Sequence, residues 1–388
     1  MMDVLSFKRK NFVSSVLTLL VSLLVLSSCQ GRSLHHVGVM TYNVENLFDV
    51  SHDEGKKDWE YLPKEFAGKA KNCKKIRKKR YRNNCLKSDW TPKRLQLKIS
   101  QIKKVISSKG QKKPEFLALE EVENEKVVRL LAKELGYSDW IVSKSPDKRG
   151  IDLAILYEES FSLKKKAVFE HEIKGGYFKK RPSRNILEGR FLINGKYHLT
   201  IFVNHWPSQG NPTKARVMVA KKLKSLIEKR LKDEPGSGIL AVGDFNILPY
   251  ENPHPVKNIL LSLDSLHDVH ELFMKDPTIS QKEKNKVPLG TYFYPPKREW
   301  NRFDRVFVNS SLLAEKDNKK GLFLDLAEYR IYNPDFITRS LKLRKKYRRG
   351  GASIVKGVPF RYNFLANKPN KAGFSDHFPV FVRLKVEN

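Results

Sequence analysis

The chain of 388 residues is 40% hydrophobic and 30% charged, which is enough for one large α/β domain or two ordinary ones. No uninterrupted apolar run reaches the roughly 18 residues of a membrane-spanning helix, so the composition excludes a body built from such helices. The formal net charge of +33 at pH 7 predicts attraction to polyanions, namely nucleic acid, anionic lipid or acidic polysaccharide, without choosing among them.

The N-terminus has the pattern of an export signal. Lys8 to Lys10 form a positive segment, Phe12 to Leu26 form an apolar stretch, and Leu26-Ser27-Ser28-Cys29 offers small residues for cleavage. This tetrapeptide resembles the lipobox of bacterial lipoproteins, and the resemblance implies removal of residues 1–28 and acylation of Cys29. We therefore expect an exported lipoprotein of the cell envelope, anchored to a membrane. A plain secretory signal or an uncleaved anchor is the alternative.

A first strand is predicted from Val37 to Tyr42, and a strongly basic segment follows it. Between Lys69 and Lys87 there are ten Lys or Arg residues and no Asp or Glu, which is typical of a solvated loop or helix face. In an oxidising compartment the two cysteines of this segment, Cys73 and Cys85, predict a disulfide, with two unpaired thiols as the alternative. We interpret the segment, about residues 66–88, as a basic insertion closed by that disulfide.

Strands and helices alternate along the rest of the chain, as in α/β proteins. The helical period of apolar residues predicts helices over 93–106, 125–135 and 216–231. Short runs rich in β-forming residues predict strands over 116–119, 153–157, 197–203, 239–242, 303–308 and 379–384.

Polar side chains that can perform chemistry stand at the ends of these strands, where residues from different strands converge in open α/β sheets. Oxygen ligands without cysteine favour Mg²⁺, Mn²⁺ or Ca²⁺ over zinc. Two imidazoles beside such an ion suit proton transfer at both ends of a phosphoryl displacement. The inventory indicates phosphodiester hydrolysis, and its members are Asn43, Glu121, Asp244, Asn246, Asp304, Asp376, His205 and His377.

Six short segments carry a specific resemblance. They are Thr41-Tyr42-Asn43-Val44-Glu45-Asn46, Leu119-Glu120-Glu121-Val122, Asn204-His205-Trp206-Pro207-Ser208, Gly243-Asp244-Phe245-Asn246, Phe303-Asp304-Arg305 and Ser375-Asp376-His377-Phe378-Pro379-Val380. In this order they resemble the motifs of the endonuclease/exonuclease/phosphatase superfamily, in its secreted bacterial nuclease-like branch. Two further segments also resemble that branch: Lys148-Arg149-Gly150-Ile151-Asp152 and Gly290-Thr291-Tyr292.

The resemblance implies a DNase I-like four-layer α/β sandwich, in which two packed mixed β-sheets are flanked by helices. We expect a linker over residues 29–36 and a single domain over residues 37–388 that contains the basic insertion.

The resemblance also implies a divalent cation, Mg²⁺ or Mn²⁺ with Ca²⁺ as an alternative. Glu121 is its principal carboxylate ligand, with Asn43 and Asp376 close to the same ion. Asp244 positions the attacking water, and Asn246 holds a phosphate oxygen. Glu120 fits better as a solvated acid at the start of a helix.

The remaining roles concern proton transfer and phosphate binding. His377 resembles the histidine that contacts the scissile phosphate, and Asp304 the acid that orients it. His205 aligns with the second imidazole, which assists the leaving oxygen, and Asp152 is a candidate to orient His205. Arg184 resembles an arginine that contacts the substrate phosphate.

These roles together predict an exported, lipid-anchored endonuclease that binds DNA or RNA as substrate. The basic segments 69–87 and 339–349 fit a nucleic-acid backbone, with general surface basicity as the alternative. A lipid phosphodiesterase or phosphatase of the sphingomyelinase or phosphoinositide type would need an apolar loop beside the site. A non-catalytic, polyanion-binding lipoprotein would have lost the catalytic residues. No protein partner can be inferred, and we expect a monomer.

Overall fold

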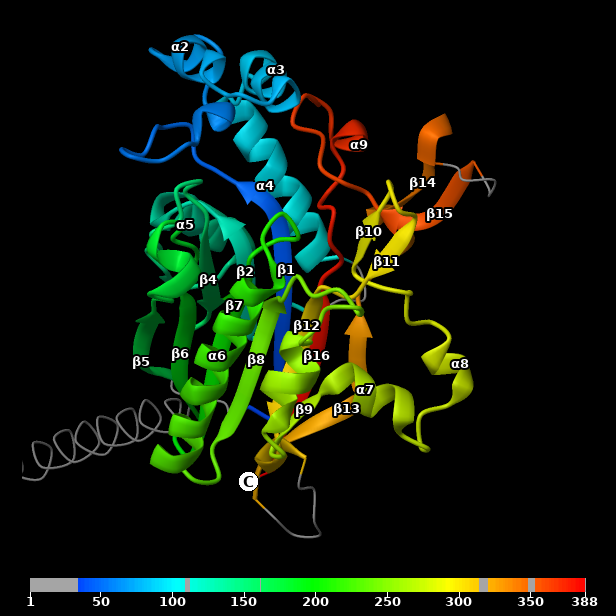
Figure 1. The fold of residues 1–388 in the computed structure, drawn as a ribbon. Coiled ribbons are helices and arrows are strands. Elements are labelled where there is room, and N and C mark those ends of the chain that lie inside the picture. Colours follow the sequence, from blue (N-terminus) through cyan, green and yellow to red (C-terminus); the bar gives the residue numbers. More distant parts are fainter. Residues whose placement is uncertain (1–33, 109–111, 161, 314–319, 348–352, 388) are drawn as a thin grey trace, which may run out of the picture.

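The computed structural model describes residues 34–108, 112–160, 162–313, 320–347 and 353–387. Two six-stranded β-sheets pack face to face, and helices cover their outer faces (Figure 1). Each sheet contains one parallel pair of strands and is otherwise antiparallel. This is the predicted DNase I-like four-layer sandwich, so the fold class is confirmed. The export signal and Cys29 lie outside the described residues.

The first sheet is centred on β1 and β2, which run parallel to each other. Its strand order is β13 (Gly321–Ile331), β16 (Val380–Glu387), β1 (His36–Leu47), β2 (Phe116–Val122), β4 (Asp152–Tyr157) and β3 (Asp139–Val142).

The second sheet is centred on the parallel pair β7 and β8. Its strand order is β5 (Leu163–His171), β6 (Ile186–Ile193), β7 (Tyr197–His205), β8 (Gly238–Asp244), β12 (Asp304–Asn309) and β9 (Leu266–Asp268). Two small ribbons stand outside the sheets: β10 (Tyr292–Tyr294) with β11 (Glu299–Asn301), and β14 (Thr338–Lys342) with β15 (Ile354–Pro359).

Three long helices cover the sandwich. Thr91 and Asn124 cap two of them through their side-chain oxygens. None of the helices in the described ranges is both long and apolar enough to cross a bilayer. The helices are α2 (Lys69–Lys74), α3 (Lys79–Lys87), α4 (Pro92–Ile106), α5 (Glu125–Leu135), α6 (Thr213–Asp233), α7 (Val269–Lys275), α8 (Gln281–Lys284) and α9 (Pro369–Ala372).

Alternation along β8 shows how the layers are joined. Side chains of a strand point alternately to the two faces of its sheet. Leu240 and Val242 pack into the core between the sheets, whereas Ile239 and Ala241 pack with α6 on the outer face. Because both faces of β8 are buried, its sequence is a continuous apolar run that leads directly to the polar residue Asp244.

The predicted helices and strands all correspond to observed ones, but several strands were not predicted. The unpredicted strands include the sheet edges β5 and β13, whose side chains are partly exposed and carry charges that hide the strand pattern. The basic insertion forms two short helices, α2 and α3, joined by the expected disulfide between Cys73 and Cys85, whose Cα atoms are 5.6 Å apart.

The buried Asp268 fixes the position of β12, the strand that carries Asp304. Its Oδ2 accepts a hydrogen bond from Arg305 at 2.7 Å, and its Oδ1 accepts one from the His270 N–H at the start of α7. Burial opposes ionisation of Asp268, but Arg305 and Arg302 outweigh it and lower the pKa of the carboxyl below its usual value of 3.8.

We therefore expect Asp268→Asn to destabilise the protein at pH 7 by about 3–5 kcal/mol, because it leaves Arg305 without its counter-charge. Since the folded-state pKa is depressed, this contribution is present above pH 3.8 and is lost as the pH falls through the folded-state value. Urea unfolding measures it, with the exposed Asp264→Asn as a control. Equal unfolding midpoints for the two variants would contradict the assignment.

Candidate active site

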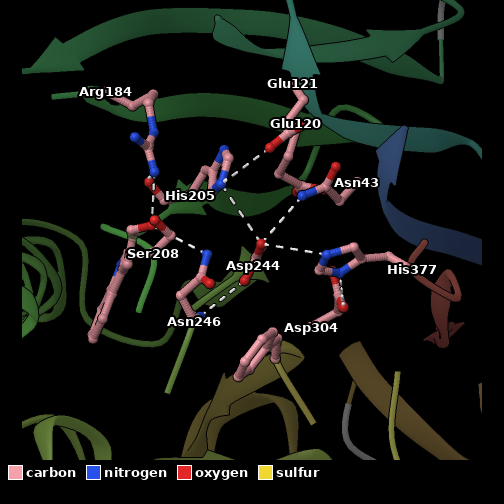
Figure 2. Close-up of polar contacts among 12 residues, drawn as sticks. Asn43, Glu120, Glu121, Arg184, His205, Ser208, Asp244, Asn246, Asp304 and His377 are labelled. Carbon is pink, nitrogen blue, oxygen red and sulfur yellow. Dashed lines mark hydrogen bonds and ion pairs between the residues drawn. The ribbon is translucent and has the colours of Figure 1, made fainter. Parts of the chain in front are cut away.

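The predicted catalytic residues meet at one end of the sandwich. They come from both sheets. The parallel pair β1 and β2 of the first sheet and the parallel pair β7 and β8 of the second sheet all end there, which brings their last residues together. The first residue of β12, Asp304, pairs with Asp244, the last residue of β8. Figure 2 shows the side chains around Asp244: Asn43, Glu120, Glu121, Arg184, His205, Ser208, Asn246, Asp304 and His377.

The backbone is irregular at these strand ends. Glu45, Glu121 and Asn246 have φ values of 53°, 64° and 49°, in the left-handed region that costs a non-glycine residue about 1–3 kcal/mol. The left-handed conformation of Glu121 coincides with a register irregularity between β2 and β4, where the consecutive glutamates 120 and 121 have different environments. Gly243 is also required here, since a Cβ atom would lie 2.0 Å from the Asn204 carbonyl oxygen.

The carboxylate of Asp244 lies at the centre of the site. Its Oδ2 accepts a hydrogen bond from Asn43 Nδ2 at 3.1 Å and lies 3.6 Å from His205 Nε2 and 4.0 Å from His377 Nε2. Its Oδ1 accepts the Asn246 N–H at 2.9 Å. Burial raises the pKa of Asp244 to about 7; the charge of His377 lowers it and that of Asp304 raises it. A carboxylate in this range is suited to accept a proton near neutral pH.

His377 and Asp304 form a buried pair. His377 Nδ1 is 2.7 Å from Asp304 Oδ2, which leaves Nε2 facing Asp244. Burial lowers the pKa of His377, but the carboxylates of Asp304, Asp244 and Asp376 outweigh burial and hold it well above 6.5. The imidazole is therefore protonated at neutral pH, and the structure places Asp304 where the sequence predicted an orienting acid.

His205 has the opposite electrostatic environment. Burial, together with the positive charges of Arg184 and Arg149, holds its pKa well below 6.5, so the ring is neutral. Its Nε2 lies 3.6 Å from Asp244 and 3.8 Å from Glu121. Because both neighbours are acceptors, the tautomer with the proton on Nε2 is favoured.

The prediction that Asp152 orients His205 is wrong. Asp152 Oδ1 accepts hydrogen bonds from the Ser143 hydroxyl and the Ser145 N–H, at 2.9 and 2.7 Å. The buried Nδ1 of His205 has no hydrogen-bond partner among the described residues. Asp152 instead fixes the loop that precedes β4.

Arg184 also differs from its predicted role. It is buried, and it donates to the carbonyl oxygens of His205 at 3.1 Å and Trp206 at 2.7 Å and to Asp147 Oδ2 at 3.1 Å. These bonds hold the end of β7, so Arg184 positions His205 and is not an exposed phosphate contact.

The three predicted metal ligands offer oxygen atoms beside this cluster. The Glu121 carboxylate makes no hydrogen bond within the described ranges and is 3.8 Å from His205 Nε2. Asn43 Oδ1 accepts a hydrogen bond from the Glu45 N–H at 3.0 Å. Asp376 Oδ1 is 3.9 Å from His377 Nε2. A set of two carboxylates and an amide oxygen fits a hard divalent cation.

A second group of possible metal ligands, Asp244, Asp304 and His377, also lies close together. A metal on His377 Nδ1 would displace the bond to Asp304, so we assign this group to proton transfer instead. In the oxygen set, by contrast, the Glu121 carboxylate makes no hydrogen bond within the described ranges.

Several residues of the site were missed or misjudged from the sequence. Glu120 is fully buried and accepts the Thr41 hydroxyl at 2.7 Å, so its prediction as a solvated acid is wrong. Burial raises its pKa well above 4.5. Ser375 donates its hydroxyl to the Asn43 carbonyl at 2.6 Å and accepts the His377 N–H at 3.1 Å, joining two catalytic segments.

Glu45 was also missed, although it lies in a quoted motif. Its carboxylate accepts Arg361 Nε at 2.5 Å and the Tyr362 N–H at 2.9 Å. Arg361 Nη2 lies 3.7 Å from Asp376 Oδ2. Arg361 belongs to none of the quoted motifs, so only the structure could show that it contacts both Glu45 and Asp376.

The fold and the cluster of carboxylates and imidazoles define the class of the protein: an α/β sandwich of phosphoesterase type. The chain belongs to the endonuclease/exonuclease/phosphatase family, whose sequence model matches residues 38–386. A search of curated protein sequences finds no match.

Solved structures show the same fold. An endonuclease/exonuclease/phosphatase family protein from Bacteroides thetaiotaomicron is 16% identical, with a TM-score of 0.52, and the alignment covers 91% of this chain and 95% of that one. A humanized D. rerio TDP2 is 13% identical, with a TM-score of 0.51 and coverages of 91% and 100%. A mannosyl-6-phosphatase from Bacteroides thetaiotaomicron is 16% identical, with a TM-score of 0.50 and coverages of 90% and 99%.

We expect Asp304→Asn to lower the pKa of His377, because it removes the charge that stabilises the imidazolium. Nitrogen-15 NMR of the histidine rings in EDTA measures this pKa, and the exposed Asp335→Asn is the matched control. An unchanged His377 titration in Asp304→Asn would show that the pair does not set the protonation state.

Proposed function

We propose that this protein is an exported, lipid-anchored phosphodiesterase that uses Mg²⁺ or Mn²⁺ to hydrolyse nucleic acid. The observation that supports it best is the position of Asp244, whose Oδ2 lies 3.6 Å from a neutral imidazole and 4.0 Å from a protonated one. A base, an acid and a hydrogen-bond donor thus face one small space, as hydrolysis of a phosphate ester requires.

In the proposed reaction, Asp244 orients a water molecule and accepts its proton as the water oxygen forms a bond to phosphorus. The bond from phosphorus to the ester oxygen breaks in line with this attack. His377 gives its Nε2 proton to that leaving oxygen, and Asp304 keeps the ring oriented throughout. His205, which the resemblance assigned to the leaving oxygen, is neutral and in this proposal donates a hydrogen bond to a phosphate oxygen from the opposite side instead. Asn246 holds the same group.

Glu121, Asn43 and Asp376 would hold the cation, and a bound Mg²⁺ or Mn²⁺ supplies Lewis-acid polarisation of a non-bridging phosphate oxygen. Arg361, which contacts both Glu45 and Asp376, would restrain the Asp376 carboxylate for this role.

The proposed diester hydrolysis and the charge of the chain together favour nucleic acid as the substrate. The net charge of +33 attracts a polyanion whose diester groups are repeated along its length. One structurally similar protein is described as a mannosyl-6-phosphatase, so a phosphate monoester belongs among the substrates to be tested.

We expect the mature chain with Cys29→Ser, which carries no lipid, to cleave plasmid DNA or RNA with Mg²⁺ or Mn²⁺ and to be inactive in EDTA. His377→Ala should lower the rate by about 10²- to 10⁴-fold, because it removes the general acid. Glu121→Gln should raise the Mg²⁺ concentration for half-maximal activity by about tenfold or more, since it weakens a ligand.

Sphingomyelin liposomes and mannose 6-phosphate serve as competing substrates in the same assay. Intact nucleic acid together with hydrolysis of either competitor would replace the proposed substrate. Inactivity toward every substrate would favour a binding lipoprotein, and an equal rate for His377→Ala would refute the assignment of the acid.

The proposed anchor has its own test. We expect the full-length protein in a bacterial host to sediment with the membranes and Cys29→Ser to appear in the soluble fraction, because the variant has no thiol to acylate. Labelling with a radioactive fatty acid checks the acylation. An unlabelled wild-type protein would show that the N-terminal segment is a plain signal or an uncleaved anchor.

A further inference from the structure

The hairpin formed by α2 and α3 is far more basic than the rest of the chain. Ten of its nineteen residues, from Lys69 to Lys87, are Lys or Arg, compared with 75 of 388 in the whole chain, and none is acidic. Eight of the ten are exposed, and none of these eight forms an ion pair within the described ranges. The basicity of this hairpin therefore exceeds the general surface bias and is not neutralised internally.

The hairpin holds these charges on a rigid support. The disulfide between Cys73 and Cys85 joins the two helices, and both cysteines are buried. Lys69, one of the two cations that are not exposed, is buried. Its Nζ donates to the carbonyl oxygens of Leu62 at 2.5 Å and Ser88 at 2.9 Å. A preformed array of cations loses little conformational freedom when it binds a ligand, which favours affinity.

The base of the hairpin rests on the strand that carries Asn43. Tyr61 stacks on Phe48, with ring centroids 4.0 Å apart, and Trp90 Nε1 donates to the Phe48 carbonyl at 3.0 Å. Phe48 directly follows β1. Figure 1 shows α2 and α3 beyond the carboxyl end of β1, the end at which the catalytic residues gather. The hairpin therefore lies at the same end of the sandwich as the catalytic residues (Figure 1).

We propose that the α2–α3 hairpin binds the phosphate backbone of a nucleic-acid strand outside the catalytic centre, while one diester of that strand occupies the site. This inference rests on the proposed function and names how its substrate is held. Such contacts are independent of base sequence and fall steeply with salt.

The composition of the hairpin favours nucleic acid over an anionic membrane. A helix that lies in a bilayer interface needs an apolar face. Within residues 69–87, all of which the structure describes, the one exposed large hydrophobic side chain is Tyr81. The hairpin can thus attract charge but has no face to insert among acyl chains.

The test compares two variants that lose equal charge. The hairpin variant carries Lys71→Gln, Lys74→Gln, Lys78→Gln and Lys79→Gln. The control variant removes four exposed lysines from β5, α6 and α7: Lys166→Gln, Lys221→Gln, Lys232→Gln and Lys275→Gln. All are made in the mature chain with Cys29→Ser.

Three measurements are compared: anisotropy of a labelled 30-nucleotide strand in EDTA across a salt series, hydrolysis of bis(p-nitrophenyl) phosphate with Mg²⁺, and binding to phosphatidylglycerol vesicles.

We expect the hairpin variant to bind the oligonucleotide at least about tenfold more weakly, with the slope of log affinity against log salt reduced by up to about 3, as four lost phosphate contacts imply. Hydrolysis of the small diester should stay within twofold of wild type, because it does not reach the hairpin. The control variant should change every measurement less than twofold.

Equal oligonucleotide binding by the two variants would overturn the inference and leave the proposed chemistry intact. Wild-type binding without cleavage, alongside hydrolysis of the small diester, would instead overturn nucleic acid as the substrate. Hairpin-dependent binding to vesicles that exceeds binding to the oligonucleotide would identify the ligand as a membrane surface.

Discussion

The buried carboxylate of Asp244 is the group on which the site depends. A buried acid needs compensating donors or charges. Here Oδ2 faces Asn43, His205 and His377, from three other segments, and Oδ1 accepts the Asn246 N–H of its own segment. The fold must therefore bring four parts of the chain together to keep one carboxylate in place, and the same neighbours are those that a phosphate ester would meet. Stability of the site and its chemistry share the same contacts.

The sheets make this convergence possible because their central strands end at the same level. The parallel pairs β1 with β2 and β7 with β8 bring Asn43, Glu121, His205 and Asp244 to one edge. The antiparallel neighbours β12 and β16 run in the opposite direction and begin at this edge. Asp304 and His377, which stand at or just before the starts of these strands, therefore also lie there. Close packing between the sheets then sets the distance between the two halves of the site.

Much of this arrangement could be predicted from the sequence. Apolar runs that end in a polar residue, such as the one before Asp244, locate a strand end and its chemistry together. The failures have physical causes. Glu120 and Glu121 are adjacent and chemically identical, so the sequence does not show that Glu120 bonds with Thr41 while Glu121 faces His205.

The hydrogen-bond partners of buried polar groups were also not predictable from the sequence. Asp152 lies in a suitable motif but bonds with Ser143 and Ser145, and Arg184 donates to backbone carbonyls. Such pairings depend on loop conformation, which no periodicity encodes. The edge strands β5 and β13 were missed because their partly exposed charges hide the alternation that buried strands show.

The direction of β1 has a consequence for how an anchored molecule would stand on its membrane. The strand begins at His36 and reaches the site at Asn43, a rise of about 23 Å over seven residue steps at roughly 3.3 Å per residue. A lipid on Cys29, seven residues before His36 (36 minus 29), would tether the opposite pole of the sandwich. The reactive end would then point outward into the surrounding medium, so the headgroups of its own bilayer would stay out of reach and dissolved polymers would be the molecules it encounters.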